Sequence, residues 1–263
     1  TSPTPTDPIG DDPVHVWAAE WAGRTGGTAE SAGYLASVSA WRDVWRPQEV
    51  RVLLVAESHV AEAPGDADIA VTVPGLPQLP TAFCRLVYCL GYGESGLCRP
   101  GPESNAGTRQ YWDIFGAIAG GPYARQPRKR DSTLEERLRW KLDVLEWLRD
   151  HGVWLVDACV AGVYVPGGGR AASGHTYERM VRDSFTRHVW PMVADEPIQQ
   201  TWIIGAGVHR ALAGHPALRT AHTIIQPQGD RASPGRHAQE LAGLVRAVRP
   251  LVPARKKKPG GGR

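Results

Sequence analysis

RVLLVAESH, at residues 51–59, is the stretch that decides the fold of this chain, because an apolar run there ends abruptly in a polar cluster. The pattern returns in VWLVDAC (153–159), TWIIGAG (201–207) and HTIIQPQGDR (222–231). Apolar runs with little alternation are typical of strands buried on both faces, as in a parallel sheet covered by helices. Ligands bind beyond the carboxyl ends of such strands. We therefore expect the four polar clusters to meet in one functional site.

Helical patterns fill the chain between these runs. The helices are predicted at 13–24, 30–41, 81–91, 109–119, 133–150, 175–194, 207–213 and 236–248. The helix at 133–150 has the clearest start, because Ser132 and Glu135 have the spacing of a capping box. Strands that alternate with helices predict an α/β fold, here a three-layer α/β/α sandwich with a central four-stranded parallel sheet.

Length and composition bound the class of protein. The chain has 263 residues, 42% hydrophobic and 22% charged, which is typical of a globular protein. No apolar run approaches the roughly 20 residues of a membrane helix, and the N-terminal residues lack the apolar stretch of a signal peptide. We expect a cytoplasmic monomer with no membrane partner. It would comprise a disordered N-terminus at 1–12, one α/β domain at 13–250 and a basic flexible tail at 251–263.

The net charge of +3 is concentrated at the C-terminus. Without Arg255, Lys256, Lys257, Lys258 and Arg263, the formal charge falls to −2. The body of the protein is therefore not basic overall. The tail suits a loose tether for a polyanion such as nucleic acid, and a solubilising terminus without a partner is the other interpretation.

The four cysteines are Cys84, Cys89, Cys98 and Cys159. Their spacing matches neither the common zinc patterns nor a CxxC redox motif. Four thiolates can hold an iron–sulfur cluster, but Cys84 and Cys89 are five apart in a predicted helix and would lie on different faces. We expect buried free thiols, and no metal or other cofactor.

Two polar clusters carry candidate catalytic groups. Glu57, Ser58 and His59 end the first apolar run, and a carboxylate beside an imidazole can orient a water or act as a general base. Asp157 ends the second run, where a buried carboxylate needs a partner. It can accept hydrogen bonds from an amino group, as an acidic residue does from N4 of cytosine. A helix-capping acid, a surface histidine and a turn-capping aspartate are the structural alternatives.

Two further segments are candidate phosphate contacts. Residues 205–207 (GAG) open a helix, which can present backbone N–H groups to a phosphate, although they lack a Walker lysine. A tight strand–helix turn is the alternative there. The polar loop 226–237 can grip a phosphate backbone or be an ordinary exposed loop.

Several aromatic side chains near the predicted element ends are candidates for stacking on a planar base. They are Phe83, Tyr111, Trp112 and Tyr164. Packing in the core is the alternative for each. Asn105, in a predicted loop, is a candidate polar contact.

Together these clusters resemble the uracil-DNA glycosylase superfamily over about residues 50–240. The first motif of that superfamily reads GQDPYH or GEAPG, and AESH stands in its place here. The glutamate of the GEAPG branch falls on Glu57, whereas the water-activating aspartate of the GQDPYH branch falls on Ser58 and is missing. The asparagine that contacts the base falls on Asp157. The histidine of the final HPSP motif falls on Gln226.

The resemblance implies a monofunctional DNA glycosylase, which flips a base out of DNA and hydrolyses its N-glycosidic bond. The implied catalytic residues are Glu57, His59 and Gln226. The implied base contacts are Phe83, Asp157 and Ser58. The implied DNA contacts are Gln228, Arg231, Ser233, Arg236, His237, Arg128, Lys129 and Arg130.

The identity of the excised base depends on Asp157. An ionised carboxylate only accepts hydrogen bonds, so a cytosine-type base, modified rather than plain, is expected in place of uracil. Some bacterial members of the superfamily act against phage DNA with modified cytosines, so the resemblance implies a role in phage defence, with the loop 162–174 shaping a larger pocket. Two alternatives stay open: a small-molecule hydrolase that uses Glu57 and His59, and a catalytically inactive nucleic-acid binding module.

Overall fold

The computed structural model describes residues 12–165, 169–170, 172–225 and 235–251. Four strands form its central sheet, all parallel, in the order β4–β1–β7–β8. Their bounds are β1 Val52–Ala56, β4 Val153–Asp157, β7 Gln200–Ile204 and β8 His222–Ile224. Every residue of β1 and β4 is buried, as expected for apolar runs covered on both faces. The predicted parallel sheet is confirmed.

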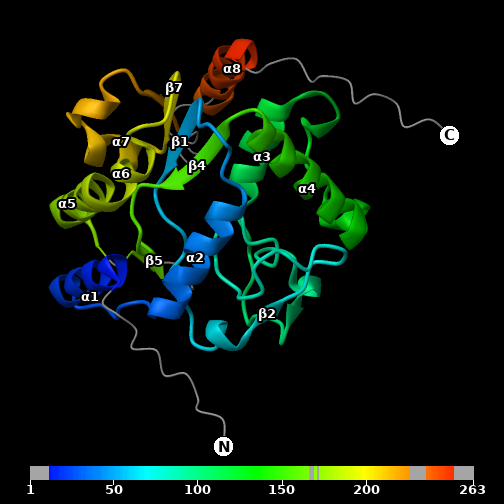
Figure 1. Cartoon of the computed structure of the whole chain (residues 1–263), viewed down its shortest axis with the longest axis horizontal. Helices are drawn as coiled ribbons and strands as arrows, with labels where there is room; N and C mark the ends of the chain where they lie inside the picture. Colours follow the sequence, from blue (N-terminus) through cyan, green and yellow to red (C-terminus); the bar gives the residue numbers. More distant parts are fainter. Residues whose placement is uncertain (1–11, 166–168, 171, 226–234, 252–263) are drawn as a thin grey trace, which may run out of the picture.

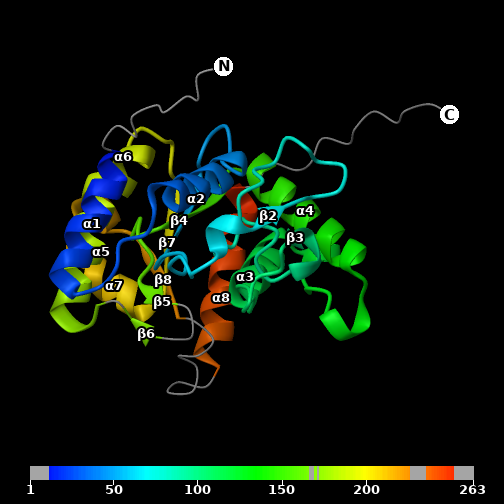
Figure 2. The ribbon, with the colours of Figure 1, turned by 90° about the horizontal axis from the view of Figure 1, so that it is seen from below.

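Helices cover both faces of this sheet (Figures 1 and 2). One face is covered by α3 (Arg109–Ala119), α4 (Leu134–Asp150) and α8 (Arg236–Val248). The other is covered by α5 (Gly174–Ser184) and α7 (Ala206–Leu212). The right-handed crossover from β1 to β4 runs in the opposite direction across the sheet to those from β4 to β7 and from β7 to β8, so their helices lie on opposite faces. The three-layer α/β/α sandwich is therefore as predicted.

Three further helical segments complete the layers. Helix α1 (Pro13–Thr25) lies beside α5, where the indoles of Trp17 and Trp21 donate to the Asp183 carboxylate at 2.7 and 3.3 Å. Helix α5 continues through one π-helical turn into the short α6 (Trp190–Val193). Helix α2 (Ala32–Val44) lies against β4, and Trp154 of that strand donates from Nε1 to the Arg42 carbonyl oxygen at 3.4 Å.

The segment 81–91, predicted as a helix, contains none. Its backbone instead pairs with the preceding loop, where the Phe83 N–H donates to the Ile69 carbonyl oxygen at 3.2 Å. Arg85 is fixed by both carboxylate oxygens of Asp66, at 2.7 and 2.9 Å. These tertiary partners hold the segment in successive turns, and they outweigh its weak local helix preference.

Helix α4 begins one residue later than its capping box predicts. Thr133, not Ser132, is the N-cap: its Oγ1 accepts from the Glu136 N–H at 3.2 Å. The Glu136 carboxylate accepts in turn from the Thr133 N–H at 2.7 Å. The sequence STLEE fits the capping-box spacing in two frames, starting at Ser132 or at Thr133, and only the backbone geometry distinguishes them.

Two short antiparallel pairs were not predicted. Strand β2 (Ala70–Val71) pairs with β3 (Cys98–Arg99), and β5 (Tyr164–Val165) pairs with β6 (Gly169–Arg170). Each has only two residues per strand, too few for a period of two to be recognised in the sequence.

The domain extends one residue beyond each predicted boundary. Asp12, predicted in the disordered N-terminus, caps α1 by accepting from the Val14 N–H at 3.0 Å. Leu251, predicted in the tail, ends a 3-10 turn and packs against the core. The remainder of both predicted terminal segments lies outside the described residues.

All four cysteines are buried and free of disulfide bonds, as the prediction of free thiols requires. Among the described helices, none has both the length and the apolar character to cross a bilayer.

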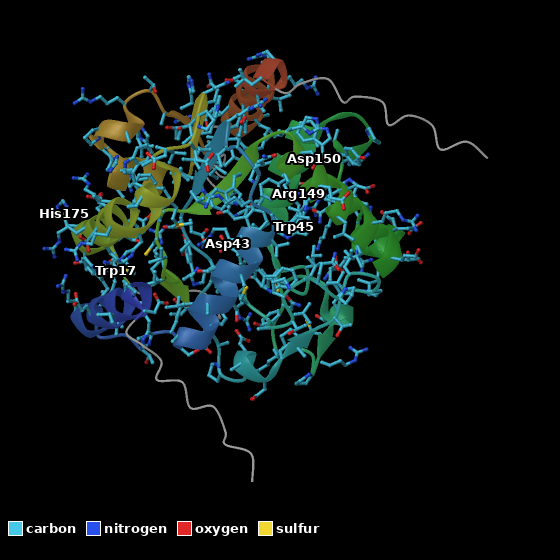
Figure 3. All side chains as sticks on the ribbon, viewed as in Figure 1. Trp17, Asp43, Trp45, Arg149, Asp150 and His175 are labelled. Atoms are coloured by element: carbon cyan, nitrogen blue, oxygen red, sulfur yellow. The ribbon has the colours of Figure 1, made fainter. Side chains whose placement is uncertain are left out.

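The amino ends of the strands are closed by contacts between α2 and α4. The Arg149 guanidinium lies 5.7 Å from the centre of the Trp45 ring, and Asp43 and Asp150 lie nearby (Figure 3). Because Arg51 and Gly152 at the starts of β1 and β4 also line this region, it is the edge of the sheet opposite to the polar clusters.

Candidate functional site

A cavity of about 770 Å³ opens at the carboxyl ends of β1 and β4. The two strands are in register there, with Ala56 beside Asp157, so that Glu57 follows directly. Glu57 and Asp157 both line this cavity, together with Ser58 and His59, and it is here called the carboxylate cavity. The expectation that the first two polar clusters meet at one edge of the sheet is confirmed, while Gln226 lies outside the described residues.

A chain of four charged groups fixes Asp157 within the protein. Glu30 Oε1 lies 3.0 Å from His59 Nε2, and His59 Nδ1 lies 3.6 Å from Asp157 Oδ2. Arg42 Nη2 donates to the same Asp157 oxygen at 3.0 Å. All four groups are buried. Negative and positive charges alternate along this ionic chain, so that it is balanced when His59 is protonated.

The pKa values of the ionic chain favour the charged forms. Burial alone would lower the pKa of His59, but the carboxylates of Glu30 and Asp157 outweigh it and raise the pKa to about 9. Burial alone would raise the pKa of Asp157, but His59 and Arg42 hold it below its ordinary value. The pKa of Glu30 is likewise lowered, because His59 outweighs burial. His59 is therefore an imidazolium at neutral pH.

This geometry gives His59 a role other than the expected one. Each ring nitrogen faces a carboxylate, Nε2 that of Glu30 and Nδ1 that of Asp157. A general base needs a neutral nitrogen directed at the proton that it removes. His59 thus holds Asp157 in place. The sequence had suggested instead that His59 acts together with Glu57.

Glu57 is buried at the cavity wall, where Arg170, Tyr164 and Tyr177 interact with its carboxylate. Its Oε1 lies 3.3 Å from Arg170 Nη2 and has no well-aligned hydrogen bond from a described residue. The Arg170 guanidinium lies over two rings, 5.1 Å from the centre of Tyr164 and 5.0 Å from that of Tyr177. A buried carboxylate oxygen without a hydrogen bond is costly, and such a group is suited to a ligand.

Ser58 connects the end of β1 to the loop after β4. Its hydroxyl accepts from the Val163 N–H at 2.9 Å and donates to the His59 carbonyl oxygen at 2.7 Å. Gly162 lies in the same loop and donates from its N–H to Glu30 Oε2 at 2.7 Å. Ser58 lines the cavity, and its bonds show that it also orders the backbone around the ionic chain.

Phe83 does not line the carboxylate cavity, contrary to the prediction that it stacks on a base. It is 2% exposed and packs edge-on against Tyr92, with ring centres 6.4 Å apart. Tyr92 itself lines the cavity, as do Tyr111 and Tyr164. A buried aromatic and a cavity-lining aromatic look alike in sequence, and only tertiary packing distinguishes them.

The predicted DNA contacts after β8 are described only in part. Gln228, Arg231 and Ser233 lie outside the described residues. Arg236 and His237 begin α8, where Arg236 pairs with Glu240 at 2.7 Å and His237 Nδ1 lies 2.7 Å from the Ile225 carbonyl oxygen. Neither of the two lines the carboxylate cavity.

The predicted contacts Arg128, Lys129 and Arg130 line a second cavity of about 610 Å³, here called the basic cavity. It shares Tyr92 and residues 106–109 with the carboxylate cavity, so the two lie side by side. Trp112, a candidate stacking residue, lines the basic cavity rather than the first one.

Two weaker candidates have structural roles. Asn105 donates from Nδ2 to the Gly91 carbonyl oxygen at 2.9 Å and accepts from the Gly93 N–H, so it braces a loop. Gly205 adopts a φ of 108°, which explains the glycine at this tight strand–helix turn.

Sequence reasoning missed Glu30 and Arg42. Arg42 falls one residue beyond the predicted helix 30–41, and Glu30 was placed at the start of that helix, although α2 begins at Ala32. Nothing local marks Arg42 as the partner of Asp157, which is 115 positions away, or Glu30 as the partner of His59, which is 29 positions away. The requirement that Asp157 have a partner was the only available clue.

The comparisons with known proteins add no relative. No protein family model matches the chain, and a search of curated proteins finds no match either.

The ionic chain predicts a loss of stability at alkaline pH. Because the folded pKa of His59, about 9, lies above the ordinary value of 6.5, its contribution is complete below 6.5. That contribution is lost as the pH rises through about 9. We expect the free energy of unfolding in urea to fall by about 1–3 kcal/mol over this window. At the acid end, the lowered pKa values of Glu30 and Asp157 predict a further loss as these carboxylates protonate.

His59→Gln should flatten the alkaline part of this profile, while His175→Gln, at a side chain that is 99% exposed, should leave it unchanged. A wild-type profile that is flat between these pH values would contradict the charged state assigned to His59.

Proposed function

We propose that this chain is a DNA glycosylase that hydrolyses the N-glycosidic bond of a cytosine-type base. The observation that carries the proposal is that Glu57 and Asp157 line one cavity at the carboxyl ends of adjacent parallel strands. The volume of about 770 Å³ falls among those of small-ligand pockets, roughly 300–1,000 Å³. Tyr92, Tyr111 and Tyr164 line the cavity and are the candidates there for stacking on a planar base.

Glu57 would serve the chemical step. Hydrolysis breaks the bond between sugar C1′ and the base nitrogen, and the electron pair of that bond leaves with the base. A water oxygen bonds to C1′, and one proton of that water passes to the departing base. A carboxylate on the cavity wall can orient the water and stabilise the positive charge that develops on the sugar. Glu57 Oε1 has no well-aligned hydrogen bond from the described part of the chain, so it can accept one from that water.

Asp157 would contact the edge of the base. His59 and Arg42 occupy one carboxylate oxygen, Oδ2, and lower the pKa of Asp157 despite its burial. An ionised carboxylate offers acceptors only. It therefore pairs with the N4 amino group of a cytosine-type base and repels O4 of uracil. This preference for amino-bearing pyrimidines supports a role against phage DNA that carries modified cytosines.

The alternative of a small-molecule hydrolase with a Glu57–His59 acid/base pair is less well supported, because both His59 nitrogens face other carboxylates. The other alternative is an inactive nucleic-acid binder. Only the formation of abasic sites distinguishes the proposed enzyme from it.

The test is a screen of otherwise identical duplexes and single strands that carry cytosine, modified cytosines, uracil or hypoxanthine. We expect abasic sites at the position of a cytosine-type base, formed at a rate at least about 5-fold above that for uracil, the lower end of one good base contact. Cleavage of the strand by hot alkali after incubation measures the abasic sites.

If the strands bind the protein in a salt-dependent way but no abasic site forms with any base, the protein is a nucleic-acid binding module and not a glycosylase. Absence of binding at low salt would overturn both nucleic-acid hypotheses.

A further inference from the structure

The basic cavity concentrates positive charge beside the carboxylate cavity. Its lining includes one carboxylate residue, Glu94, among the described residues. Its cationic lining residues are Arg109, Arg128, Lys129, Arg130, Arg137 and Lys141. An excess of one sign of charge inside a hollow raises the local concentration of ions of the other sign. The cavity is therefore suited to an anion.

Its floor is a buried ion cluster with one carboxylate for two cations. Glu94 is 3% exposed and accepts from Arg137 through both oxygens, with the closest contact at 2.9 Å from Nη2. Lys141 Nζ donates to Glu94 Oε1 at 3.0 Å and lies 5.1 Å from the centre of the Trp112 ring. Glu94 can neutralise only one of the two cations, so the floor keeps a positive charge.

The crowding of positive charge is visible in Lys141. Burial lowers the pKa of this lysine, and Lys129 and Arg137 lower it further, against the opposing effect of Glu94. An anion in the cavity would relieve this repulsion.

The rim consists of Arg128, Lys129 and Arg130, of which Arg130 pairs with Asp131 at 3.2 Å. Neither Arg128 nor Lys129 forms an ion pair with a described residue, and both side chains are exposed. Gln126, beside them, has a buried Oε1 that accepts no hydrogen bond within the described part of the chain.

The wall between the two cavities is thin backbone. Gly93 and Gly107 have φ values of 92° and 70°, and a Cβ on Gly107 would lie 2.9 Å from the Gly93 Cα. Glycine at both positions therefore lets residues 106–109 lie directly on the chain at Tyr92. The two cavities therefore adjoin along residues 106–109, which line both.

We propose that the basic cavity binds backbone phosphates of the strand whose base enters the carboxylate cavity. The inference rests on the proposed function and extends it, because it assigns the backbone phosphates of the DNA strand to a second cavity beside the one that takes the base. The volume of about 610 Å³ is many times the roughly 30 Å³ share of one water molecule, which leaves room for more than one phosphate.

The experiment compares two variants of equal charge. Arg128→Gln/Lys129→Gln/Arg130→Gln removes the rim of the basic cavity. Its control removes three cations that line neither cavity, by Arg24→Gln/Arg139→Gln/Arg210→Gln, at side chains that are 59%, 68% and 71% exposed. The probe is an oligonucleotide whose bases the enzyme does not excise, titrated at several salt concentrations, with inorganic phosphate as a second ligand.

We expect the rim variant to bind the oligonucleotide about 10- to 100-fold more weakly at low salt. The slope of log affinity against log salt should also be shallower by about 2, as the loss of two or three phosphate contacts requires. The control should keep the wild-type slope within about 0.5. Inorganic phosphate should bind far more weakly than the oligonucleotide and should not displace it.

Equal slopes for the two variants would overturn the proposal. So would a rim variant that loses binding of inorganic phosphate while its affinity for the oligonucleotide is unchanged. Because the enzyme does not act on the probe, this experiment tests phosphate binding separately from catalysis. The wild-type protein can fail to excise any base while the rim variant still shows a shallower salt dependence of binding.

Discussion

Glu57→Gln is expected to reduce turnover by roughly 100-fold or more, the scale of a lost acid/base or electrostatic group. The amide keeps the shape of the side chain but cannot carry the charge that stabilises a positive sugar. Affinity for DNA should change little, since the proposed phosphate contacts lie elsewhere. Single-turnover excision measures the rate, and equilibrium binding to the same duplex measures the affinity.

Glu49→Gln is the matched control, because Glu49 precedes β1 as Glu57 follows it, and its side chain is 58% exposed at the opposite edge of the sheet. Near wild-type turnover in Glu57→Gln would remove this carboxylate from the mechanism. Equal losses in the two variants would show a general effect of the substitution on the protein.

Asp157→Asn is expected to destabilise the fold by about 3–5 kcal/mol, the cost of breaking a buried ion pair from one side. The amide leaves the buried Arg42 guanidinium without its anion and leaves His59 with Glu30 alone. Charge balance in the ionic chain is lost. The free energy of unfolding in urea at neutral pH measures the effect.

Arg42→Met/Asp157→Asn removes one charge of each sign and restores the balance. We expect it to be less destabilised than the sum of its two single variants, with a coupling energy of about 0.5–3 kcal/mol. Additive effects would mean that Arg42 and Asp157 act independently, contrary to their 3.0 Å contact.

The single variant Asp157→Asn also tests base preference, provided that it is assayed well below its unfolding temperature. An amide can donate to O4 of uracil, so Asp157→Asn should shift competitive excision towards uracil by roughly 5- to 150-fold, the range of one bidentate contact. An unchanged preference would exclude Asp157 as the group that contacts the base.

The site residues that could be predicted from the sequence are those that directly follow a strand. Glu57 and Asp157 each follow a buried apolar run, so their shared edge follows from the direction of parallel strands. His59 was found by the same rule. Glu30, which contacts His59, and Arg42, which contacts Asp157, were not found, because they come from the chain around and within α2. The sequence therefore pointed to the cavity and mistook the function of its histidine.

By itself, the sequence determined the parallel sheet, the helices that cover it and the edge at which polar groups gather. These features follow from the periodicity of apolar residues and from continuous apolar runs, both of which can be recognised in consecutive residues. Tertiary structure alone decided that Phe83 is core, that 81–91 is not a helix and that the basic cavity adjoins the carboxylate cavity. Each of these depends on contacts between distant segments, such as Arg85 with Asp66, or Glu94 with Lys141. Long-range pairing of buried charges carries no periodicity, so no stretch of sequence reveals it before the chain has folded.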